Sequence, residues 1–282
     1  MRLGLKPGWL NRRIDFKETA GTASVLGPLG LNTVCNRARC PNISECFSKK
    51  TATFLILGHI CTRGCGFCNI EKGEPGEEPK GGAEAVLGAV KKLGIRHAVI
   101  TSVTRDDLDD GGAGAFKEVI KKIKGHDDKI AVEVLVPDFM GSAAAVNTVL
   151  SAGPDILGHN LEVVKRLYAV RRGADYERTL FVLKTAALSG VKTKSSIMLG
   201  LGETTGELLE AFGDLRSAGC SFLSLGQYLR PAFKNTPVER YVEPAEFEEL
   251  KKRAYEAGFE HVESGPYVRS SYNAAAYLEA KG

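Results

Sequence analysis

The sequence lacks any apolar run near the roughly 20 residues that a membrane-spanning helix needs, and its first residues lack the apolar stretch of a secretory signal. It also has no block of five or six like charges, because the net charge of +4 is spread along the chain. Nucleic-acid binding therefore has little support, and a mildly acidic protein partner would suit the charge equally. These absences predict a globular protein of the reducing cytoplasm, with no nucleic acid and no membrane as partner.

Cysteine is scarce outside one short region. Six of the seven cysteines form two groups of three, here called the first triplet and the second triplet: Cys35, Cys40 and Cys46, then Cys61, Cys65 and Cys68. Three thiolates can hold three irons of a 4Fe-4S cluster and leave the fourth iron open, whereas electron carriers usually add a fourth cysteine. The spacing therefore favours two iron–sulfur clusters with a chemical role. The seventh cysteine, Cys220, is predicted to be a small buried residue at the start of a strand.

Zinc and disulfides are the alternatives for these thiols. Three thiolates and a histidine can form a tetrahedral zinc site, and His59 and His97 are available. Two structural zinc sites would need two further ligands and paired C-x2-C spacings, which only Cys65 and Cys68 show. A disulfide framework is typical of short secreted chains, and no signal peptide is predicted. Iron–sulfur clusters are favoured over both.

Strands and helices alternate along most of the chain. Strands are predicted at 51–57, 97–101, 130–136, 156–159, 191–199 and 222–225, and helices at 83–93, 113–124, 141–150, 179–188, 207–218 and 244–257. Such alternation implies a parallel sheet of the α/β class, either an open doubly wound sheet or a barrel. Six βα units favour a partial (β/α)6 TIM-type barrel.

Three parts of the chain are predicted from these patterns. Residues 1–50 are short of strand or helix periodicity and rich in turn formers, so we expect an irregular N-terminal extension that carries the first triplet. Residues 51–263 form the partial barrel, and residues 264–282 form a C-terminal tail. Since reactive groups of such folds gather at the C-terminal ends of strands, the second triplet, directly after the first strand, suits an active-site loop.

The second triplet resembles a known motif. Residues 61–68 (CTRGCGFC) carry the C-x3-C-x2-C signature of radical S-adenosylmethionine enzymes, with an aromatic residue before the last cysteine. The resemblance implies that the open iron binds the amino and carboxylate groups of S-adenosylmethionine (SAM). It also implies that an electron from the cluster breaks the C–S bond of SAM and gives a 5′-deoxyadenosyl radical.

The rest of the chain, from Arg37 to Tyr272, resembles the lipoyl synthase family. The shared motifs are residues 39–46 (RCPNISEC), 51–54 (TATF), 104–113 (TRDDLDDGGA), 159–162 (HNLE), 198–203 (MLGLGE), 226–231 (GQYLRP) and 269–272 (RSSY). The resemblance implies that the first triplet holds an auxiliary 4Fe-4S cluster, with Ser271 as its fourth ligand. It further implies that the radical removes hydrogen from C6 and C8 of a protein-bound octanoyl-lysine and that the auxiliary cluster donates both sulfur atoms.

Four polar residues near predicted strand ends are candidates for binding SAM: Ser102, Glu133, Asn160 and Lys194. Two of them have simpler interpretations, since Glu133 alternates with valines and suits a hydrogen-bonding residue inside the barrel, while Lys194 suits a solvated surface charge. The acidic and glycine residues of 105–112 are predicted to lead into a helix N-terminus. Two residues beside the second triplet depart from the family pattern, namely His59, where Asp is expected, and Asn69, where a small residue is frequent.

The resemblance also implies partners. The substrate would be an octanoylated carrier, either a glycine-cleavage H protein or a dehydrogenase E2 acyltransferase subunit. The clusters need a reductant such as ferredoxin or flavodoxin, and an enzyme that consumes its own cluster needs a repair protein or stops after one turnover.

Two other functions stay open on the sequence. One is a different sulfur-inserting enzyme similar to biotin synthase or a methylthiotransferase, although the first triplet argues against it. The other is an electron carrier or cluster scaffold, which would leave the βα architecture unexplained.

Overall fold

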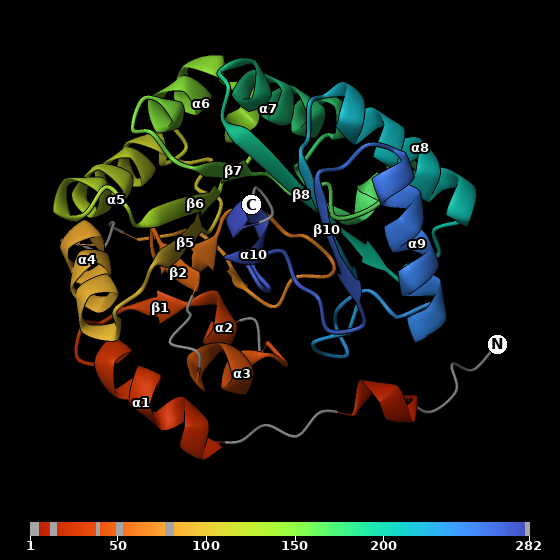
Figure 1. The fold of residues 1–282 in the computed structure, drawn as a ribbon, viewed down its shortest axis with the longest axis horizontal. Coiled ribbons are helices and arrows are strands. Elements are labelled where there is room, and N and C mark those ends of the chain that lie inside the picture. The colour runs from red at the N-terminus through yellow and green to blue at the C-terminus, as the bar shows by residue number, and fades with distance from the viewer. Residues whose placement is uncertain (1–5, 12–15, 38–39, 49–52, 77–81, 280–282) are drawn as a thin grey trace. The chain divides into compact units, whose positions relative to one another are not determined.

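The computed structural model describes residues 6–11, 16–37, 40–48, 53–76 and 82–279 (Figure 1). They form two compact units. The N-terminal unit comprises residues 14–64 and 69–157, and the C-terminal unit comprises residues 1–13, 65–68 and 158–282. The chain therefore enters the C-terminal unit between Gly64 and Cys65 and returns to the N-terminal unit between Cys68 and Asn69. The predicted boundaries after residues 50 and 263 separate parts of the chain by their expected roles, whereas the two units are defined by compactness. These boundaries stay a prediction.

The N-terminal unit is built on three parallel neighbouring strands: β2 (Thr53–Ile56), β5 (His97–Ser102) and β6 (Ala131–Leu135). Helices follow the strands along their outer side (Figure 1): α4 (Gly82–Leu93), α5 (Ala113–His126) and α6 (Ala143–Leu150). Each helix buries an apolar stripe, as α4 does with Val86, Val90 and Leu93, because these positions recur with the helical period. The strand β7 (Ile156–Gly158) ends where the chain enters the C-terminal unit.

Residues 109–112 lead into α5 as predicted. Gly112 occupies the N-cap position with a φ of 88°, a conformation that glycine adopts without strain. The Asp110 carboxylate accepts hydrogen bonds from the N–H groups of Gly112 and Gly114, at 2.8 and 2.7 Å. A Cβ on Gly112 would lie 2.2 Å from Leu57 Cδ1, so close packing against the end of the first strand also requires glycine there.

The expectation of an irregular first fifty residues is wrong in part. The described residues of this region form η1 (Gly8–Leu10), α1 (Phe16–Leu26), β1 (Asn32–Thr33), α2 (Val34–Arg37) and α3 (Ile43–Ser48). Their sequence gives a weak signal, since α1 contains glycine, serine and threonine, which are poor helix formers. Packing against α3 and α4 stabilises α1 instead. Residues 38, 39 and 49–52, which include parts of two predicted motifs and the predicted start of the first strand, lie outside the described residues.

The C-terminal unit repeats the parallel arrangement. Its strands are β8 (Lys192–Leu199), β9 (Phe222–Gln227) and β10 (His261–Gly265), in that order, and its main helices are α7 (Tyr176–Leu188), α8 (Thr205–Ser217) and α9 (Pro244–Glu256). The strand β10 was missed because its sequence, HVESG, has a single strongly apolar residue. A short α10 (Ala276–Glu279) follows it, and a turn of 3-10 helix, η3 (Lys165–Val170), precedes α7.

The α/β class with mostly parallel strands is thus confirmed.

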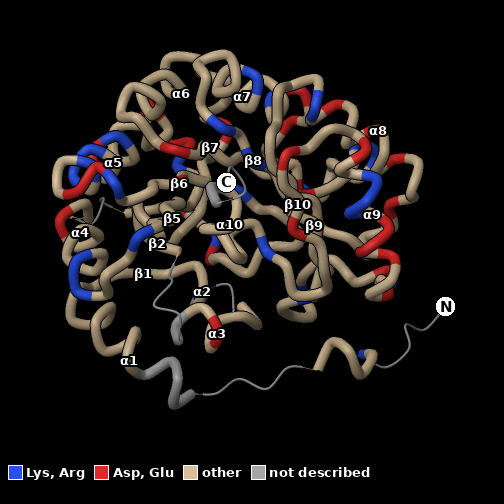
Figure 2. Tube along the Cα trace, in the orientation of Figure 1, with Lys and Arg blue, Asp and Glu red and all other residues tan. Residues whose placement is uncertain are grey.

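Lysines and arginines are interspersed with acidic residues along the outer helices of each unit (Figure 2). Within the part of the chain that is described, no helix has the length and apolar character needed to cross a membrane.

Candidate functional site

The first triplet lies on short helical segments beside the strand β2. Cys35 is in α2 and Cys46 is in α3, and Cys40 lies between these helices. The Cys40 N–H donates to the Cys35 carbonyl at 3.0 Å. Burial raises the pKa of the Cys35 thiol to about 11, although hydrogen bonds with Thr53 at the start of β2 oppose this shift. A metal ion binds the thiolate form of cysteine, so ligation by Cys35 would require the loss of this proton.

The second triplet begins in the two-residue strand β3 (Ile60–Cys61), which pairs with β4 (Glu71–Lys72). The next residue, Thr62, is fixed to the loop that follows β5. Its N–H and hydroxyl donate to the Thr104 carbonyl at 3.1 and 3.0 Å, and its hydroxyl accepts from the Asp106 N–H at 3.1 Å. The chain that carries Cys61 is therefore tied to the C-terminal end of the neighbouring strand.

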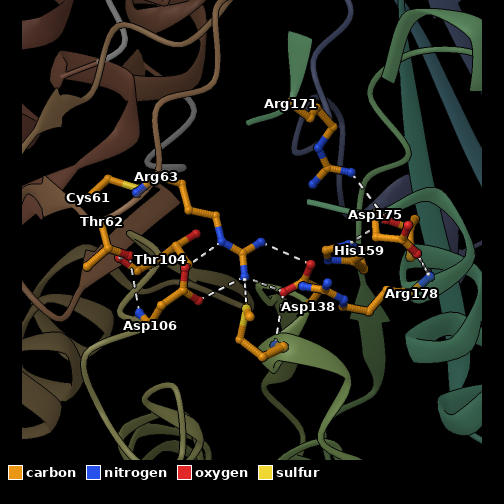
Figure 3. Close-up of polar contacts among 12 residues, drawn as sticks. Cys61, Thr62, Arg63, Thr104, Asp106, Asp138, His159, Arg171, Asp175 and Arg178 are labelled. Atoms are coloured by element: carbon orange, nitrogen blue, oxygen red, sulfur yellow. Dashed lines mark hydrogen bonds and ion pairs between the residues drawn. The ribbon is translucent and has the colours of Figure 1, made fainter. Parts of the chain in front are cut away.

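Arg63 also anchors this segment, and Figure 3 shows its guanidinium between two carboxylates. The guanidinium donates to both oxygens of Asp106, at 2.6 and 2.8 Å, and to both oxygens of Asp138, at 2.9 and 2.7 Å. The exposed fractions are 6% for the Arg63 side chain, 28% for Asp106 and 0% for Asp138. Burial opposes the charge of Arg63, but the hydrogen bonds to both aspartates outweigh it and raise the pKa of the guanidinium above its ordinary value.

The sequence analysis treated residues 105–112 mainly as a helix approach and missed this second role. Asp106 belongs to the motif 104–113, but Asp138 belongs to none of the motifs identified. An arginine between the first two cysteines of an iron–sulfur motif is a signal that a carboxylate partner is needed, since a buried charge is costly without one. Arg105 makes a separate pair with Asp107, at 2.8 Å, and this hydrogen bond lowers the pKa of the Asp107 carboxyl.

A hydrogen bond between described residues joins the segments that carry the two triplets. The Asn69 side-chain amide donates to the Arg37 carbonyl at 3.2 Å, and Arg37 ends the helix that carries Cys35. The other unusual residue, His59, lies 3.9 Å from Glu71 and has 41% of its side chain exposed. The two departures from the family pattern therefore have different surroundings.

The four predicted SAM contacts lie in or shortly after strands of the sheet. Ser102 ends β5, and its buried hydroxyl has no hydrogen-bond partner among the described residues, which suits a group that binds a ligand. Glu133 is buried in β6 with a carboxylate oxygen 3.2 Å from His97 Nε2, in line with an interior hydrogen-bonding role. Asn160 follows β7, and its amide donates to Glu162 at 2.9 Å.

The surroundings of Lys194 show that its simpler interpretation, a solvated surface charge, is wrong. Lys194 is 2% exposed, and its ammonium lies 3.7 Å from the centre of the Tyr277 ring. Lys194 lies in the part of β8 where residues 193–197 are all buried. A cation above an aromatic face is favourable when both are shielded from water.

A polar network that the sequence analysis missed orders the loop after β7. Thr179 on α7 contacts His159 Nε2 at 3.1 Å and the Tyr168 hydroxyl at 2.5 Å. Arg171 donates to the same Tyr168 hydroxyl and to the Asn160 carbonyl, at 2.5 and 2.9 Å. This network fixes the backbone of the predicted ligand-binding residue Asn160. Of its residues only His159 and Asn160 lie in a predicted motif, so spacing could not have found the others.

Ser271 lies in the tail after β10. The tail is packed closely on β9, where a Cβ on Gly226 would lie 2.1 Å from the Val268 carbonyl. Tyr277 anchors its end, because its buried hydroxyl is hydrogen-bonded to Ser224 in β9 at 2.7 Å and its ring contacts His261 in β10. The tail that carries Ser271 is thus fixed on both sides of this residue.

The donor set fits iron–sulfur clusters by its chemistry. All seven cysteines lie within the described residues, and none of them forms a disulfide. Soft thiolates are the usual ligands of such clusters. Among the described residues, no three His, Cys, Asp or Glu side chains are already arranged around one metal position. Cys220 is fully buried before β9, as predicted, and burial raises its pKa to about 12.

The class of protein follows from a match to a known superfamily. Residues 55–215, more than half of the chain, match the model of the radical SAM superfamily. Two solved structures show the same fold. Methylornithine synthase (PylB) has a TM-score of 0.54 at 13% identity, over 75% of this chain and 70% of that chain. SuiB of Streptococcus suis, bound to its precursor peptide, has a TM-score of 0.60 at 14% identity, over 80% and 50%. The fold is the partial (β/α) barrel of radical SAM enzymes, as predicted.

Curated relatives are closer in sequence. A lipoyl synthase from Citrifermentans bemidjiense is 54% identical over 98% of this chain and 96% of its own length. A lipoyl synthase from Geobacter metallireducens is 50% identical over 98% and 99%. The chain belongs to the lipoyl synthase family.

Proposed function

We propose that this protein forms lipoyl groups by inserting sulfur at C6 and C8 of a protein-bound octanoyl-lysine, with two 4Fe-4S clusters and SAM. The observation that carries the proposal is the presence of two cysteine triplets in a member of the lipoyl synthase family. An electron carrier needs neither the open iron nor the βα architecture around it.

The second triplet is proposed to hold the cluster that binds SAM, and the first triplet to hold the cluster that donates sulfur. When bound, these groups supply radical and sulfur chemistry that amino-acid side chains cannot. The chain's own residues fix the thiols, as Arg63 does through Asp106 and Asp138. Ser102, Glu133, Asn160 and Lys194 are the proposed contacts of SAM, and Ser102 has the best support because its buried hydroxyl lacks a described partner.

Ser271 is proposed as the fourth ligand of the cluster at the first triplet. A hard oxygen donor holds iron differently from a soft thiolate and leaves more readily on protonation, which suits a cluster that must be dismantled. The close packing of the tail on β9 and the anchor at Tyr277 support a fixed position for this serine. Replacing Ser271 by Cys should slow sulfur insertion, and an undiminished yield would contradict this role.

The proposed partners are an octanoylated H protein or E2 subunit as substrate, and ferredoxin or flavodoxin as reductant. Repair of the consumed cluster requires a further protein, and the proposed compartment is the cytoplasm, where thiols stay reduced.

An anaerobic single-turnover assay tests the function. Cluster-loaded protein, SAM, a strong reductant and an octanoyl-lysyl peptide should give 5′-deoxyadenosine and a peptide with two added sulfur atoms, both read by mass spectrometry. Cys220→Ala is the matched control, because this cysteine lies outside both triplets, and it should keep both products. Deoxyadenosine without sulfur in the peptide would move the substrate elsewhere. Neither product from protein with intact clusters would favour an electron carrier or scaffold.

A further inference from the structure

The turn between Cys65 and Cys68 is held by chain segments far away in the sequence. The Gly66 N–H donates to the Val170 carbonyl at 2.8 Å, and the Gly66 carbonyl accepts from the Thr236 N–H at 3.0 Å. A Cβ on Gly66 would lie 2.5 Å from Thr236 Oγ1 and 3.0 Å from Val170 Cγ2, so any other residue here would force its neighbours to shift. The conformation of this turn is therefore set from outside the motif.

Asn235 makes the most specific of these contacts. Its side-chain amide donates to two carbonyls of the turn, those of Gly66 and Cys68, each at 3.0 Å. An amide NH2 has two hydrogens, so each carbonyl can receive one. Asn235 is 3% exposed, and its buried side-chain oxygen has no hydrogen-bond partner among the described residues. The side chain thus serves the turn with its donors alone.

The segment that presents Asn235 is itself rigid. The Asn235 N–H donates to the Ala232 carbonyl at 3.0 Å, and its own carbonyl accepts from Arg230 Nε at 2.8 Å. The Tyr228 hydroxyl donates to the Thr236 carbonyl at 2.7 Å. A backbone held in this way can present the Asn235 side chain to the neighbouring turn in one geometry.

We propose that Asn235 is a positioning residue for the cluster at the second triplet and that it tunes the reduction potential of this cluster. Bonding the two carbonyls fixes the Gly66–Phe67 peptide plane, which lies between two ligands, and the Cys68–Asn69 peptide plane, which follows the last ligand. The N–H of a trans peptide points opposite to its carbonyl, so the Phe67 N–H is directed away from Asn235. Dipoles and hydrogen bonds near cluster sulfurs set the potential. The proposal rests on the proposed function, because it requires a cluster at Cys61, Cys65 and Cys68.

The test compares Asn235→Ala and Asn235→Asp with the wild-type holoprotein. Alanine removes both donors, and aspartate keeps the shape but replaces the donors by an acceptor. Asn147→Ala is the matched control, since Asn147 is an exposed asparagine on α6. Electron paramagnetic resonance at fixed potentials gives the ratio of reduced to oxidised cluster. The change in the spectrum on adding SAM identifies the cluster with the open iron.

Both Asn235 variants should lower the ratio of reduced to oxidised SAM-responsive cluster about tenfold, because uncompensated carbonyls disfavour the added electron. For a one-electron couple this equals about 59 mV. Iron release from this cluster to a chelator should also become roughly tenfold faster, while Asn147→Ala stays like the wild type. A ratio and a release rate within about twofold of the wild type in both folded variants would overturn the proposal. A wild-type protein without any SAM-responsive cluster would instead overturn the proposed function.

Discussion

The two cysteine triplets border the same strand, β2, but their segments are ordered in different ways. Cys35 contacts Thr53 at the start of β2, and Cys61 follows the end of the strand. Local backbone hydrogen bonds order the first triplet, such as the bond from the Cys46 N–H to the Asn42 carbonyl at 2.9 Å. Side chains distant in the sequence order the second, from Asp106 and Asp138 to Asn235. The second triplet should therefore be the more sensitive to substitutions elsewhere in the chain.

The largest effect is expected from Arg63→Gln. This change leaves the carboxylate of Asp138 buried without its cation, which typically costs about 3–5 kcal/mol in the free energy of unfolding. Urea unfolding should show this loss, and iron analysis should show that the second triplet loses its cluster before the first. Arg96→Gln is the matched control, because Arg96 is 81% exposed and its pair with Asp127 at 3.4 Å should contribute less than about 1 kcal/mol.

The two carboxylates that pair with Arg63 should contribute unequally to stability. Asp138→Asn should destabilise the protein more than Asp106→Asn, because Asp138 is fully buried whereas Asp106 keeps 28% of its side chain in contact with water. The opposite order in urea unfolding would show that burial does not govern the strength of the anchor.

A smaller effect is expected from Gly66→Ala. The added methyl group would lie 2.5 Å from Thr236 Oγ1 and 3.0 Å from Val170 Cγ2, and such overpacking costs about 1–3 kcal/mol. Gly125→Ala in α5 is the control, since a Cβ there meets no atom within 4 Å, and alanine in a helix should be neutral or stabilising by up to about 1 kcal/mol. Equal unfolding free energies for both variants would mean that the turn adapts freely.

The smallest effect concerns pH. Burial raises the pKa of Tyr228 to about 12 from its ordinary value of 10. The folded protein then holds this proton between pH 10 and 12 while the unfolded chain releases it, so stability is full below pH 10 and falls as the pH rises. The slope from one such group is at most about 1.4 kcal/mol per pH unit.

Tyr228→Phe removes this part of the pH dependence. It also removes the hydrogen bond to the Thr236 carbonyl, a loss of about 1 kcal/mol at neutral pH. Urea unfolding of the wild type and the variant at several values between pH 8 and 11.5 measures both effects. Parallel pH profiles would show that Tyr228 titrates normally in the folded protein.

The sequence alone predicted the helices and strands whose apolar residues recur with a clear helical or strand period. The helix α5, predicted from 113 to 124, begins at Ala113, and β5 and β6 fall within one residue of their predicted bounds. It failed where packing outweighs local preference, as in α1 and β10. The polar sequence of β10 is tolerated because His261 and Glu263 contact each other at 3.2 Å and Asn273 donates to Glu263.

In the predicted site, too, the sequence located the residues defined by local spacing and missed those that depend on distant contacts. Cysteine spacing located the ligands, because ligand spacing is a local property of the chain. The anchors were beyond reach, since Asp138 and Asn235 lie 75 and 169 residues from their partners Arg63 and Gly66, and neither has a distinctive neighbourhood in the sequence. Lys194 was misjudged for a related reason, because its aromatic partner Tyr277 lies in the C-terminal tail.

The two triplets are proposed to hold clusters with different roles, and two cysteine variants test this difference most directly. Cys40→Ala and Cys65→Ala are each compared with the wild type in the anaerobic single-turnover assay, with 5′-deoxyadenosine and sulfurated peptide measured in the same reaction. Cys40→Ala should still form deoxyadenosine but add no sulfur, whereas Cys65→Ala should form neither product. Sulfur insertion by Cys40→Ala, or deoxyadenosine from Cys65→Ala, would contradict the assignment of the two clusters.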